Sequence, residues 1–500
     1  MHGHVGTLLW TICYFCVVLG LSAYGIHRYS IIYLYFKNRH RKPLAASRFD
    51  FLPVVTVQLP IYNEIHVVER LLKAISELDY PKEKLEIQVL DDSTDETRQL
   101  TERAVAKLKT RGFDAIVLRR ENRVGFKAGA LDYGFKNAKG EFFFILDADF
   151  VPPRNILRES IHYFCDPKVG MIQTRWGHIN RSYSWLTRAQ AILLDGHLVL
   201  EQTARSRTGR FFNFNGTAGL WRKRCIGESG GWQHDTLTED LDLSYRAQLR
   251  GWRFVFLADI VTPAELPIDI DGFKSQQHRW TKGSIQTCKK VLPRIWRSKL
   301  PLFVKTEATA HLTANFTYLL LAFLCVLLHP SKASGPVAGG VARALLIDLP
   351  IFVATTVSTA VFYLCAQREL HPKDWKREIW FFPFVLALGI GLSINNARGV
   401  LEAIFNRSSD FCRTPKYGIE RAKQEWQSSR YTAVRTVIPL VEFVFAVYFT
   451  YFVFRAFQNR EFLSVPFLML FQIGFAYVAF GSVWQRLVRP QWTPRDISVA

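Results

Sequence analysis

The sequence lacks the two glycine-rich signatures by which many nucleotide-binding enzymes are recognised. No G-x-x-x-x-G-K-[ST] segment is present, and no G-x-G-x-x-G segment follows a predicted strand. The first absence argues against a P-loop enzyme and the second against a dinucleotide-dependent dehydrogenase. A nucleotide bound by this chain would therefore have to be held by other groups.

Acidic residues are scarce relative to basic ones. The 43 Asp and Glu residues stand against 64 Lys and Arg residues, which gives a formal charge of +21. Such a surplus is typical of nucleic-acid-binding proteins, or of membrane proteins whose cytoplasmic loops face anionic lipid. Since no nucleic-acid-binding module is recognisable, we attribute the charge to membrane lipid and expect no nucleic-acid partner.

Cysteine is sparse and gives no disulfide or metal framework. The eight cysteines are scattered, and the C-x-x-C pair Cys13 and Cys16 lies inside a long apolar run, where a redox or zinc role is not expected. A cytosolic catalytic region with reduced thiols fits this pattern.

Long apolar runs are abundant. The first, 8–26, carries no charge, and the basic residues Arg28, Lys37 and Arg39 follow it rather than precede it, unlike a signal peptide. About 20 apolar residues suffice for a membrane-spanning helix. Further runs occupy residues 308–328, 341–366, 380–395, 437–454 and 462–484.

The run at 380–395 differs from the others because it is short and ends in Asn395-Asn396. Basic residues prevail on both sides of it, which by the positive-inside rule places both flanks in the cytoplasm. We therefore expect this run not to cross fully, which leaves five spans, with six as the alternative. The amino terminus would lie outside and the basic carboxy-terminal tail inside, in a multi-pass protein of the plasma (inner) membrane.

These runs divide the chain into three regions. We expect an N-terminal span with its basic flank (1–42), a cytosolic region with interfacial helices (43–307) and a C-terminal membrane region (308–500). In the cytosolic region, strand-like and helix-like segments alternate, which predicts an α/β fold with crossover helices. The strands are predicted at 54–60, 85–92, 114–120 and 142–150, and the helices at 66–78, 94–109 and 127–138.

Two of the predicted strands end in pairs of acids, Asp91-Asp92 and Asp147-x-Asp149. In an extended strand, residues i and i+2 project to one side, so Asp147 and Asp149 would point the same way. Ligands of parallel sheets bind beyond the carboxyl ends of the strands. A nucleotide diphosphate with a divalent cation would satisfy both acidic pairs, because carboxylates and phosphates are hard oxygen ligands.

Two further stretches carry chemistry. Thr238 precedes Glu239 and Asp240 at a predicted helix start, where Thr is a good cap and acids suit the helix dipole. The stretch 273–283 places Gln276, Arg279 and Trp280 together, although an amphipathic helix on the membrane surface would show the same residues.

In this order, the acidic pairs, Thr238-Glu239-Asp240 and the segment QQHRW at 276–280, followed by membrane spans, resemble the membrane-embedded family 2 glycosyltransferases. The closest type is cellulose synthase, with its cellulose synthase-like mannan and glucomannan synthase relatives. The resemblance covers nearly the whole chain. It implies a cytosolic GT-A domain, with a Rossmann-like mixed sheet, inserted between transmembrane helices. It also implies inverting hexose transfer from UDP-glucose or GDP-mannose with Mn²⁺ or Mg²⁺.

The resemblance also assigns roles to residues. The general base would be Asp240, beside Glu239; the metal would be bound by Asp147 and Asp149; the nucleotide sugar would be contacted by Asp91, Asp92, Tyr62, Glu64, Lys127, Asp147, Gln276 and Arg279. The acceptor would be contacted by Trp280, Gly216 and Thr217, and a gating-type loop near 406–420 would contribute Phe411, Thr414 and Lys416. Asn215-Gly216-Thr217 and Arg413 depart from the cellulose synthase pattern, so acceptor details stay open.

Three functions remain after this reading. The leading one is a processive polysaccharide synthase that passes its product across the membrane, and the first alternative transfers one sugar to a lipid such as a ceramide or diacylglycerol. A transporter or receptor that merely binds nucleotides is the third, and the complete acidic set with Arg279 argues against it. The tail after Trp484 is too short for a cyclic-dinucleotide-binding barrel. Donor sugar, linkage, oligomeric state and accessory subunits stay open.

Overall fold

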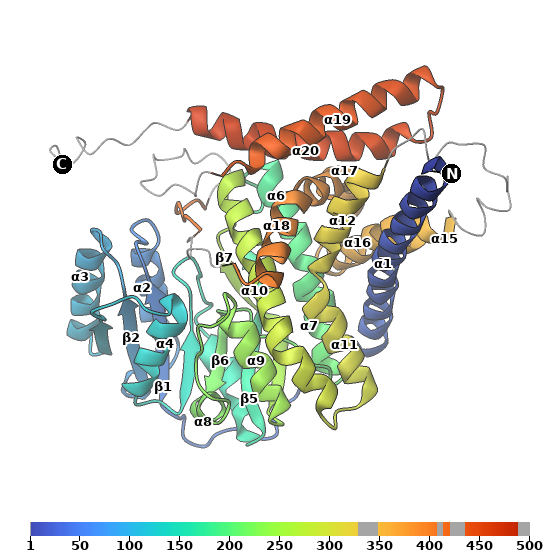
Figure 1. Ribbon diagram of the computed structural model, residues 1–500. Helices are drawn as coiled ribbons and strands as arrows, with labels where there is room; N and C mark the ends of the chain where they lie inside the picture. Colours follow the sequence, from blue (N-terminus) through green and yellow to red (C-terminus); the bar gives the residue numbers. More distant parts are fainter. Residues whose placement is uncertain (1, 329–348, 408–413, 421–435, 489–500) are drawn as a thin grey trace.

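The computed structural model describes residues 2–328, 349–407, 414–420 and 436–488. Its centre is one seven-stranded sheet, at the lower left of Figure 1. The strands are β1 (Val55–Ile61), β2 (Leu85–Asp91), β3 (Asp114–Leu118), β4 (Phe142–Ile145), β5 (Val169–His178), β6 (Gly219–Arg222) and β7 (Arg253–Ala264).

The sheet is mixed, with the order β3-β2-β1-β4-β6-β5-β7. Strands β1 to β4 run parallel to one another, β6 is antiparallel to both of its neighbours, and β5 pairs with β7 in parallel. The predicted α/β fold with a Rossmann-like mixed sheet is confirmed. Because β1, β2 and β4 are parallel neighbours, their carboxyl ends lie along one edge of the sheet.

Helices cover both faces of the sheet. On one face lie α2 (Val68–Ser76), α3 (Thr97–Thr110) and α5 (Ile156–Ser160); on the other lie α4 (Phe126–Lys136), α8 (Lys223–Glu228) and α9 (Glu239–Leu249). Strand β4 shows why: Phe142 and Phe144 pack into the first core, while Phe143 and Ile145 pack into the second. Burying each such side chain contributes roughly 1.5–3 kcal/mol.

The sheet is joined to the rest of the molecule by helices that follow β5 and β7. After β5 come α6 (Trp185–Asp195), a π-helical turn η3 (Gly196–Glu201) and α7 (Gln202–Arg207). After β7, the long helix α10 (Ile270–Arg297) begins where the Asp269 carboxylate accepts a hydrogen bond from the Gly272 N–H, at 2.6 Å. Helix α10 then packs against α9, α11 (Leu302–Thr313) and α18 (Ser393–Ile404).

Five helices of the described residues are long and apolar enough to cross a membrane, and a bent pair would make six. The five cover Leu8–Asn38, Leu349–Leu370, Lys376–Ile404, Ile438–Gln458 and Val465–Gln485. They comprise α1 (His2–Asn38), α15 (Leu349–Phe352), η5 (Val353–Val357), α16 (Ser358–Leu370), α17 (Lys376–Gly391), α18 (Ser393–Ile404), α19 (Ile438–Gln458) and α20 (Val465–Val488). Helices α19 and α20 run side by side across the top of Figure 1.

The set of spans differs from the predicted one in two places. The bent pair is α11 (Leu302–Thr313) with α12 (Phe316–Leu327), which meet at 55° where an uninterrupted span was expected at 308–328. Conversely, the run at 380–395 is longer than expected: its helix extends over Lys376–Ile404, which is long and apolar enough to cross a membrane. The start of the 341–366 run and most of the basic tail lie outside the described residues.

The longer helix is explained by where its polar residues go. Asn395 donates from Nδ2 to the backbone carbonyl of Lys274 in α10, at 2.9 Å, and also to Asn396 at 3.0 Å. Both amides are buried. The Asn395-Asn396 pair therefore packs against protein rather than lipid, so it does not end the helix.

Candidate active site

A cavity of about 200 Å³ opens at the carboxyl ends of β1, β2 and β4. Most of the predicted site residues line it, although they come from eight separate segments of the chain. These lining residues are Tyr62, Glu64, Asp92, Lys127, Asp147, Asp149, Gly216, Glu239, Asp240, Gln276, Arg279, Trp280, Thr414 and Lys416. Asp91 and Thr217 lie outside the lining, and Phe411 lies outside the described residues.

The two carboxylates of Asp147 and Asp149 are carried by a turn, not by an extended strand. Strand β4 ends at Ile145, and the Phe150 N–H donates to the Asp147 carbonyl at 3.2 Å, which closes the turn. The prediction that the two carboxylates project together from the strand is therefore wrong in its geometry. Both still face the cavity, because the turn itself forms part of its wall.

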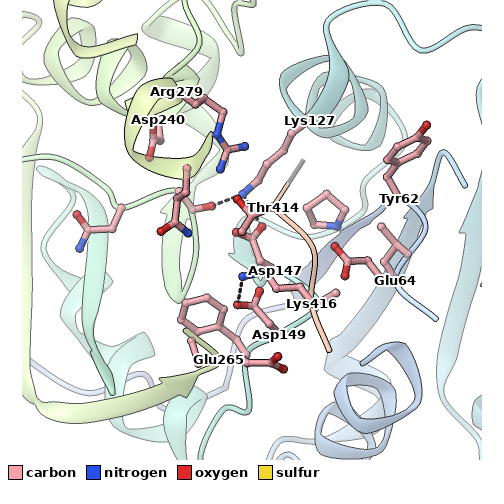
Figure 2. Close-up of a pocket in the computed structure, with 18 of the residues that line it drawn as sticks. Tyr62, Glu64, Lys127, Asp147, Asp149, Asp240, Glu265, Arg279, Thr414 and Lys416 are labelled. Atoms are coloured by element: carbon pink, nitrogen blue, oxygen red, sulfur yellow. Dashed lines mark hydrogen bonds and ion pairs between the residues drawn. The ribbon is translucent and has the colours of Figure 1, made fainter. Parts of the chain in front are cut away.

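Each of these carboxylates is paired with a lysine (Figure 2). Lys127 Nζ lies 2.5 Å from Asp147 Oδ1, and Lys416 Nζ lies 2.6 Å from Asp149 Oδ2. Burial alone would lower the pKa of Lys127, but the carboxylates of Asp147, Glu239 and Asp240 outweigh it and raise the pKa. The pKa of Lys416 is raised against burial by Asp149 in the same way. The turn thus attracts cations strongly.

Thr217 and Gly216 hold Asp147 and Lys127 in place through hydrogen bonds. The Thr217 hydroxyl accepts a hydrogen bond from the Asp147 N–H at 2.8 Å, and the Gly216 carbonyl accepts one from Lys127 at 2.9 Å. Gly216 has a φ of +82°, and a Cβ built on it would lie 3.0 Å from Asp240 Oδ2. Only glycine combines this backbone conformation with so close an approach.

Asp240 lies in the first turn of α9, and its carboxylate faces the cavity. Burial, with a smaller contribution from the adjacent Glu239, raises the pKa of Asp240 to about 7. A carboxylate with a pKa near neutrality is suited to accept a proton from a substrate. The predicted helix start is confirmed, with Thr238 at the N-cap position of α9, but Thr238 makes no side-chain capping hydrogen bond; its hydroxyl lies 3.2 Å from the Thr287 hydroxyl on α10.

The adjacent acids Asp91 and Asp92 have different surroundings. The Asp91 carboxylate is buried, and it accepts hydrogen bonds from the Thr101 hydroxyl at 2.7 Å and the Ser93 N–H at 3.0 Å. Arg119 also pairs with it, at 3.2 Å. Asp92 lines the cavity and is held by the Arg120 guanidinium, with Nε at 3.1 Å.

Tyr62 and Arg123 form a flat wall at the Asp92 end of the cavity. The Arg123 guanidinium lies 3.3 Å from the centroid of the Tyr62 ring. Both residues line the cavity. A stacked guanidinium and phenol give a planar surface of the kind on which a nucleobase stacks. Arg123 had no signal in the sequence, because only the fold brings it over Tyr62.

Gln276, Arg279 and Trp280 project from one side of α10 into the cavity, as their spacing of three and four residues requires. Figure 2 draws Arg279 and Asp240 above the Asp147–Asp149 turn, and all four residues line the cavity. The region predicted to be an amphipathic helix is thus a helix, and it contributes a cation and an aromatic ring to the site.

Glu265 is a site residue that the sequence did not reveal. Its buried carboxylate accepts hydrogen bonds from the backbone N–H groups of Tyr417 and Gly418, at 2.9 and 3.0 Å. Burial raises the pKa of Glu265. The Tyr417 hydroxyl donates to Asp269 at 2.8 Å. These contacts anchor residues 414–420 beside the cavity and hold Lys416 over Asp149.

The residues present fit a divalent cation held jointly with a ligand. Within the described ranges, no group of three or more His, Cys, Asp or Glu side chains forms a complete metal site. Asp147 and Asp149 offer two oxygen donors at a place that already attracts two ammonium groups. A hard cation bound there would need further oxygen ligands, which phosphates supply.

The sheet, its helical layers and the strand-end cavity define the protein as a GT-A type α/β fold. A family model described as "Glycosyltransferase like family 2" matches residues 53–283. The chain is 32% identical over 408 residues to glucomannan 4-beta-mannosyltransferase 1 of Cyamopsis tetragonoloba, which covers 78% of this chain and 74% of the relative. The chain belongs to the family 2 glycosyltransferases, and its relatives are of the cellulose synthase-like type.

Two other matches extend this finding. Glucomannan 4-beta-mannosyltransferase 2 of Arabidopsis thaliana is 43% identical over 267 residues, covering 52% of this chain; the chain spans about half of that relative, 49%. Among solved structures, a mannosyltransferase from Pyrobaculum calidifontis, in complex with GDP-Man and Mn2+, aligns with a TM-score of 0.55. It is 21% identical, with 79% of this chain and 99% of that chain covered, so the likeness is one of fold.

Proposed function

We propose that this chain is an inverting, metal-dependent hexosyltransferase that polymerises a β-linked polysaccharide from a nucleotide sugar, with GDP-mannose as the favoured donor. The observation that carries the proposal is the position of Asp240, whose pKa is about 7, in one cavity with Asp147 and Asp149. The names of the relatives and the GDP-Man in the Pyrobaculum structure support mannose over glucose. Inversion at the anomeric carbon follows from the single displacement that is proposed below.

The nucleotide is proposed to bind at the β1 and β2 end of the cavity. Its base would stack on the Tyr62 and Arg123 wall, and Asp92 would accept hydrogen bonds from the base or ribose. Glu64 completes that part of the lining. Asp91 would support this part of the site indirectly, because its carboxylate accepts a hydrogen bond from the Ser93 N–H and pairs with Arg119.

Asp147 and Asp149 would hold Mn²⁺ or Mg²⁺, which neutralises charge on the diphosphate when bound. Lys127 and Lys416 are paired with these carboxylates in the structure, and they would pair with phosphate oxygens instead once the metal is bound. Thr414 and Gln276, which also line the cavity, would contact the diphosphate beside them. Each buried ammonium group would remain paired throughout, because it exchanges a carboxylate partner for a phosphate partner.

In the chemical step, Asp240 would remove the proton from the acceptor hydroxyl as that oxygen forms a bond to the anomeric carbon. The bond from that carbon to the diphosphate oxygen breaks, and the nucleoside diphosphate leaves with the electron pair. Arg279 would stabilise the charge that grows on it. Glu239 keeps the pKa of Asp240 high, and Trp280 would stack on the acceptor sugar.

The domain and membrane arrangement is part of the same proposal. Residues 43–307 would form the cytosolic catalytic region, and 1–42 and 308–500 would anchor it in the plasma membrane. A growing chain would leave the cavity between α10 and the membrane helices, where Trp280 lies on the wall. Repeated transfer and export go together in this arrangement, because the product never has to leave the membrane-bound enzyme.

The deciding experiment is sugar transfer by the purified chain in lipid vesicles. Radiolabelled GDP-mannose and UDP-glucose are supplied with Mn²⁺ or Mg²⁺, and the product is sized beside the Asp240→Asn variant. Long polymer from GDP-mannose, lost in the variant, is the expected result. A product of one sugar on a lipid would overturn processive synthesis in favour of glycolipid synthesis.

A further inference from the structure

A second cavity, of about 240 Å³, lies between α1, α11 and the turn that follows α7. It shares no lining residue with the active-site cavity. Its walls combine charged, hydroxylated and apolar side chains. They are His27, Ser30, Tyr33, Leu34, Arg210, Phe303, Thr306 and Glu307.

The cavity holds an arginine, Arg210, that has no carboxylate partner among the described residues. Its one carboxylate, Glu307, is already paired with Arg205 at 2.9 Å and His27 at 3.1 Å. Among the described residues, Arg210 has no carboxylate partner; its guanidinium lies over the Phe303 ring, 5.0 Å from the centroid. A guanidinium that is only partly exposed and lacks an anion is unusual, because charge removed from water is normally paired.

A second cation, Lys37, lies against one of the lining residues. Lys37 donates to the Tyr33 hydroxyl at 3.1 Å, and its ammonium lies 5.4 Å from the centroid of that ring. Within the described ranges of the chain, no carboxylate forms an ion pair with it either. Arg210 therefore lines the cavity, and Lys37 lies one residue away from it, against Tyr33 on α1.

The surroundings of the cavity are apolar and exposed. Tyr33 is 59% exposed, Phe303 47%, Leu302 66% and Trp296 48%. Tyr33 lies on α1, which is a candidate membrane span, Leu302 and Phe303 lie at the start of α11, and Trp296 lies at the end of α10. Exposed aromatic and aliphatic residues beside unpaired cations are typical of the level at which lipid headgroups meet acyl chains.

The hydroxyl groups of Ser30 and Thr306 favour a headgroup that can donate hydrogen bonds. The Ser30 hydroxyl donates to the His27 carbonyl at 2.9 Å, and the Thr306 hydroxyl donates to the Phe303 carbonyl at 3.3 Å. Their protons are thus engaged, and their oxygens are left to accept. A headgroup that itself carries hydroxyl groups would provide the donors.

We propose that this cavity binds the headgroup of an anionic phospholipid that carries free hydroxyls, such as a glycerol or inositol headgroup. The Arg210 guanidinium forms paired hydrogen bonds with the phosphate, and Lys37 supplies the second charge. The headgroup hydroxyls donate to Ser30 and Thr306. The acyl chains lie along Tyr33, Leu302 and Phe303.

The readout has to be lipid binding rather than sugar transfer, because this wall is connected to the active site. Glu307 pairs with Arg205, Arg205 pairs with Glu201 at 3.1 Å, and Glu201 lies 2.9 Å from His197. His197 in turn lies 3.4 Å from Asn215, which lines the active-site cavity. A binding measurement also makes the test independent of the proposed catalytic function.

The experiment is a native mass spectrometry titration of the full purified chain in detergent with phosphatidylglycerol, phosphatidylcholine or inorganic phosphate. We expect phosphatidylglycerol to bind several-fold more tightly than phosphatidylcholine. Arg210→Gln should weaken phosphatidylglycerol binding about tenfold, as the loss of charge-assisted hydrogen bonds does. Lys37→Gln should weaken it less. Arg455→Gln is the matched control, since Arg455 is an exposed arginine in the last turn of a membrane helix, α19, and lines neither cavity.

Three results would overturn the proposal: equal binding of the two lipids, unchanged binding by Arg210→Gln, or displacement of the lipid by millimolar inorganic phosphate, which would indicate a free-anion site. If Arg210→Gln lowers the thermal stability, Arg210→Lys decides the matter. It keeps the charge but loses the paired hydrogen bonds, so a loss of several-fold supports the site and no loss contradicts it.

Discussion

The Lys416 ammonium lies 2.6 Å from the Asp149 carboxylate, although the two residues are separated by 267 positions in the sequence. A positive charge from a distant segment of the chain thus pairs with one of the two carboxylates proposed to bind the metal. The pair is held in place by Glu265, which binds the backbone just after Lys416. Metal binding and the position of residues 414–420 are linked by this contact.

Replacing Lys416 with methionine should raise the Mn²⁺ affinity of the nucleotide-free protein about tenfold, because the competing cation is removed. The rate of sugar transfer should fall in the same variant, since the ammonium is no longer available to the diphosphate. Mn²⁺ binding is measured by electron paramagnetic resonance. Lys139→Met is the control, because it removes an exposed ion pair with Asp114, of 2.6 Å, outside the cavity. Unchanged Mn²⁺ affinity in the Lys416 variant would contradict the competition.

The Asp240→Asn substitution should lower kcat by roughly 10²–10⁴, the usual contribution of a general base. Nucleotide affinity should stay within about twofold, because the lost proton acceptor acts on the other substrate. The two quantities are measured by initial rates and by calorimetric titration with the nucleoside diphosphate. Asp235→Asn serves as the control, since Asp235 lies nearby on the surface and lines no part of the cavity. A matched loss of nucleotide affinity would point to a binding role instead.

The pH dependence of kcat/KM should show an ascending limb with an apparent pKa of about 7, because Asp240 must lose its proton to act as a base. Glu239→Gln should move that limb to lower pH, since removal of the adjacent negative charge lowers the pKa of Asp240. The raised pKa also affects stability. Because folded Asp240 keeps its proton up to about pH 7 while the unfolded chain releases it near pH 4, the free energy of unfolding should decrease as the pH rises from about 4 to about 7. A limb that Glu239→Gln leaves in place would show that another group titrates.

The Gly216→Ala substitution should reduce activity at least tenfold without unfolding the protein. A Cβ at this position would lie 3.0 Å from Asp240 Oδ2, with φ at +82°. The backbone strain alone costs roughly 1–2 kcal/mol. Gly112→Ala separates strain from contact, because Gly112 has a φ of +84° but open space where the Cβ would be. Both variants should lose similar thermal stability, and equal activities would contradict the proposed contact.

Asp91 and Asp92 should give different outcomes despite being neighbours. Asp92→Asn should weaken nucleotide binding several-fold, because Asp92 lines the cavity. Asp91→Asn should chiefly destabilise the fold, by roughly 1–3 kcal/mol, since its buried carboxylate accepts from Thr101, Ser93 and Arg119. Calorimetric titration and urea unfolding distinguish the two, and a reversal of the pattern would show that Asp91 contacts the nucleotide directly.

Local sequence patterns were enough to predict the class of fold and most residues of the cavity. Strand and helix periodicities are local properties, so the four parallel strands and the helices between them could be predicted to within a few residues. The acids at strand ends could also be predicted to lie together, because parallel strands bring their carboxyl ends to one edge. The order of acidic motifs before membrane spans then indicated the family.

The side-chain contacts that hold those residues in place became visible only in the folded chain. Side-chain partners depend on contacts between distant segments, so neither the Lys416 to Asp149 pair nor the Glu265 anchor had a local signal. The turn that carries Asp147 depends on the Thr217 hydroxyl, which arrives from another strand connection. The helix through Asn395 continues because α10 satisfies its amide, where sequence alone indicated an interruption. From the sequence alone, a polar residue in an apolar run suggests that the helix ends there. In the folded protein its hydrogen-bond partner shows that it packs against another helix instead.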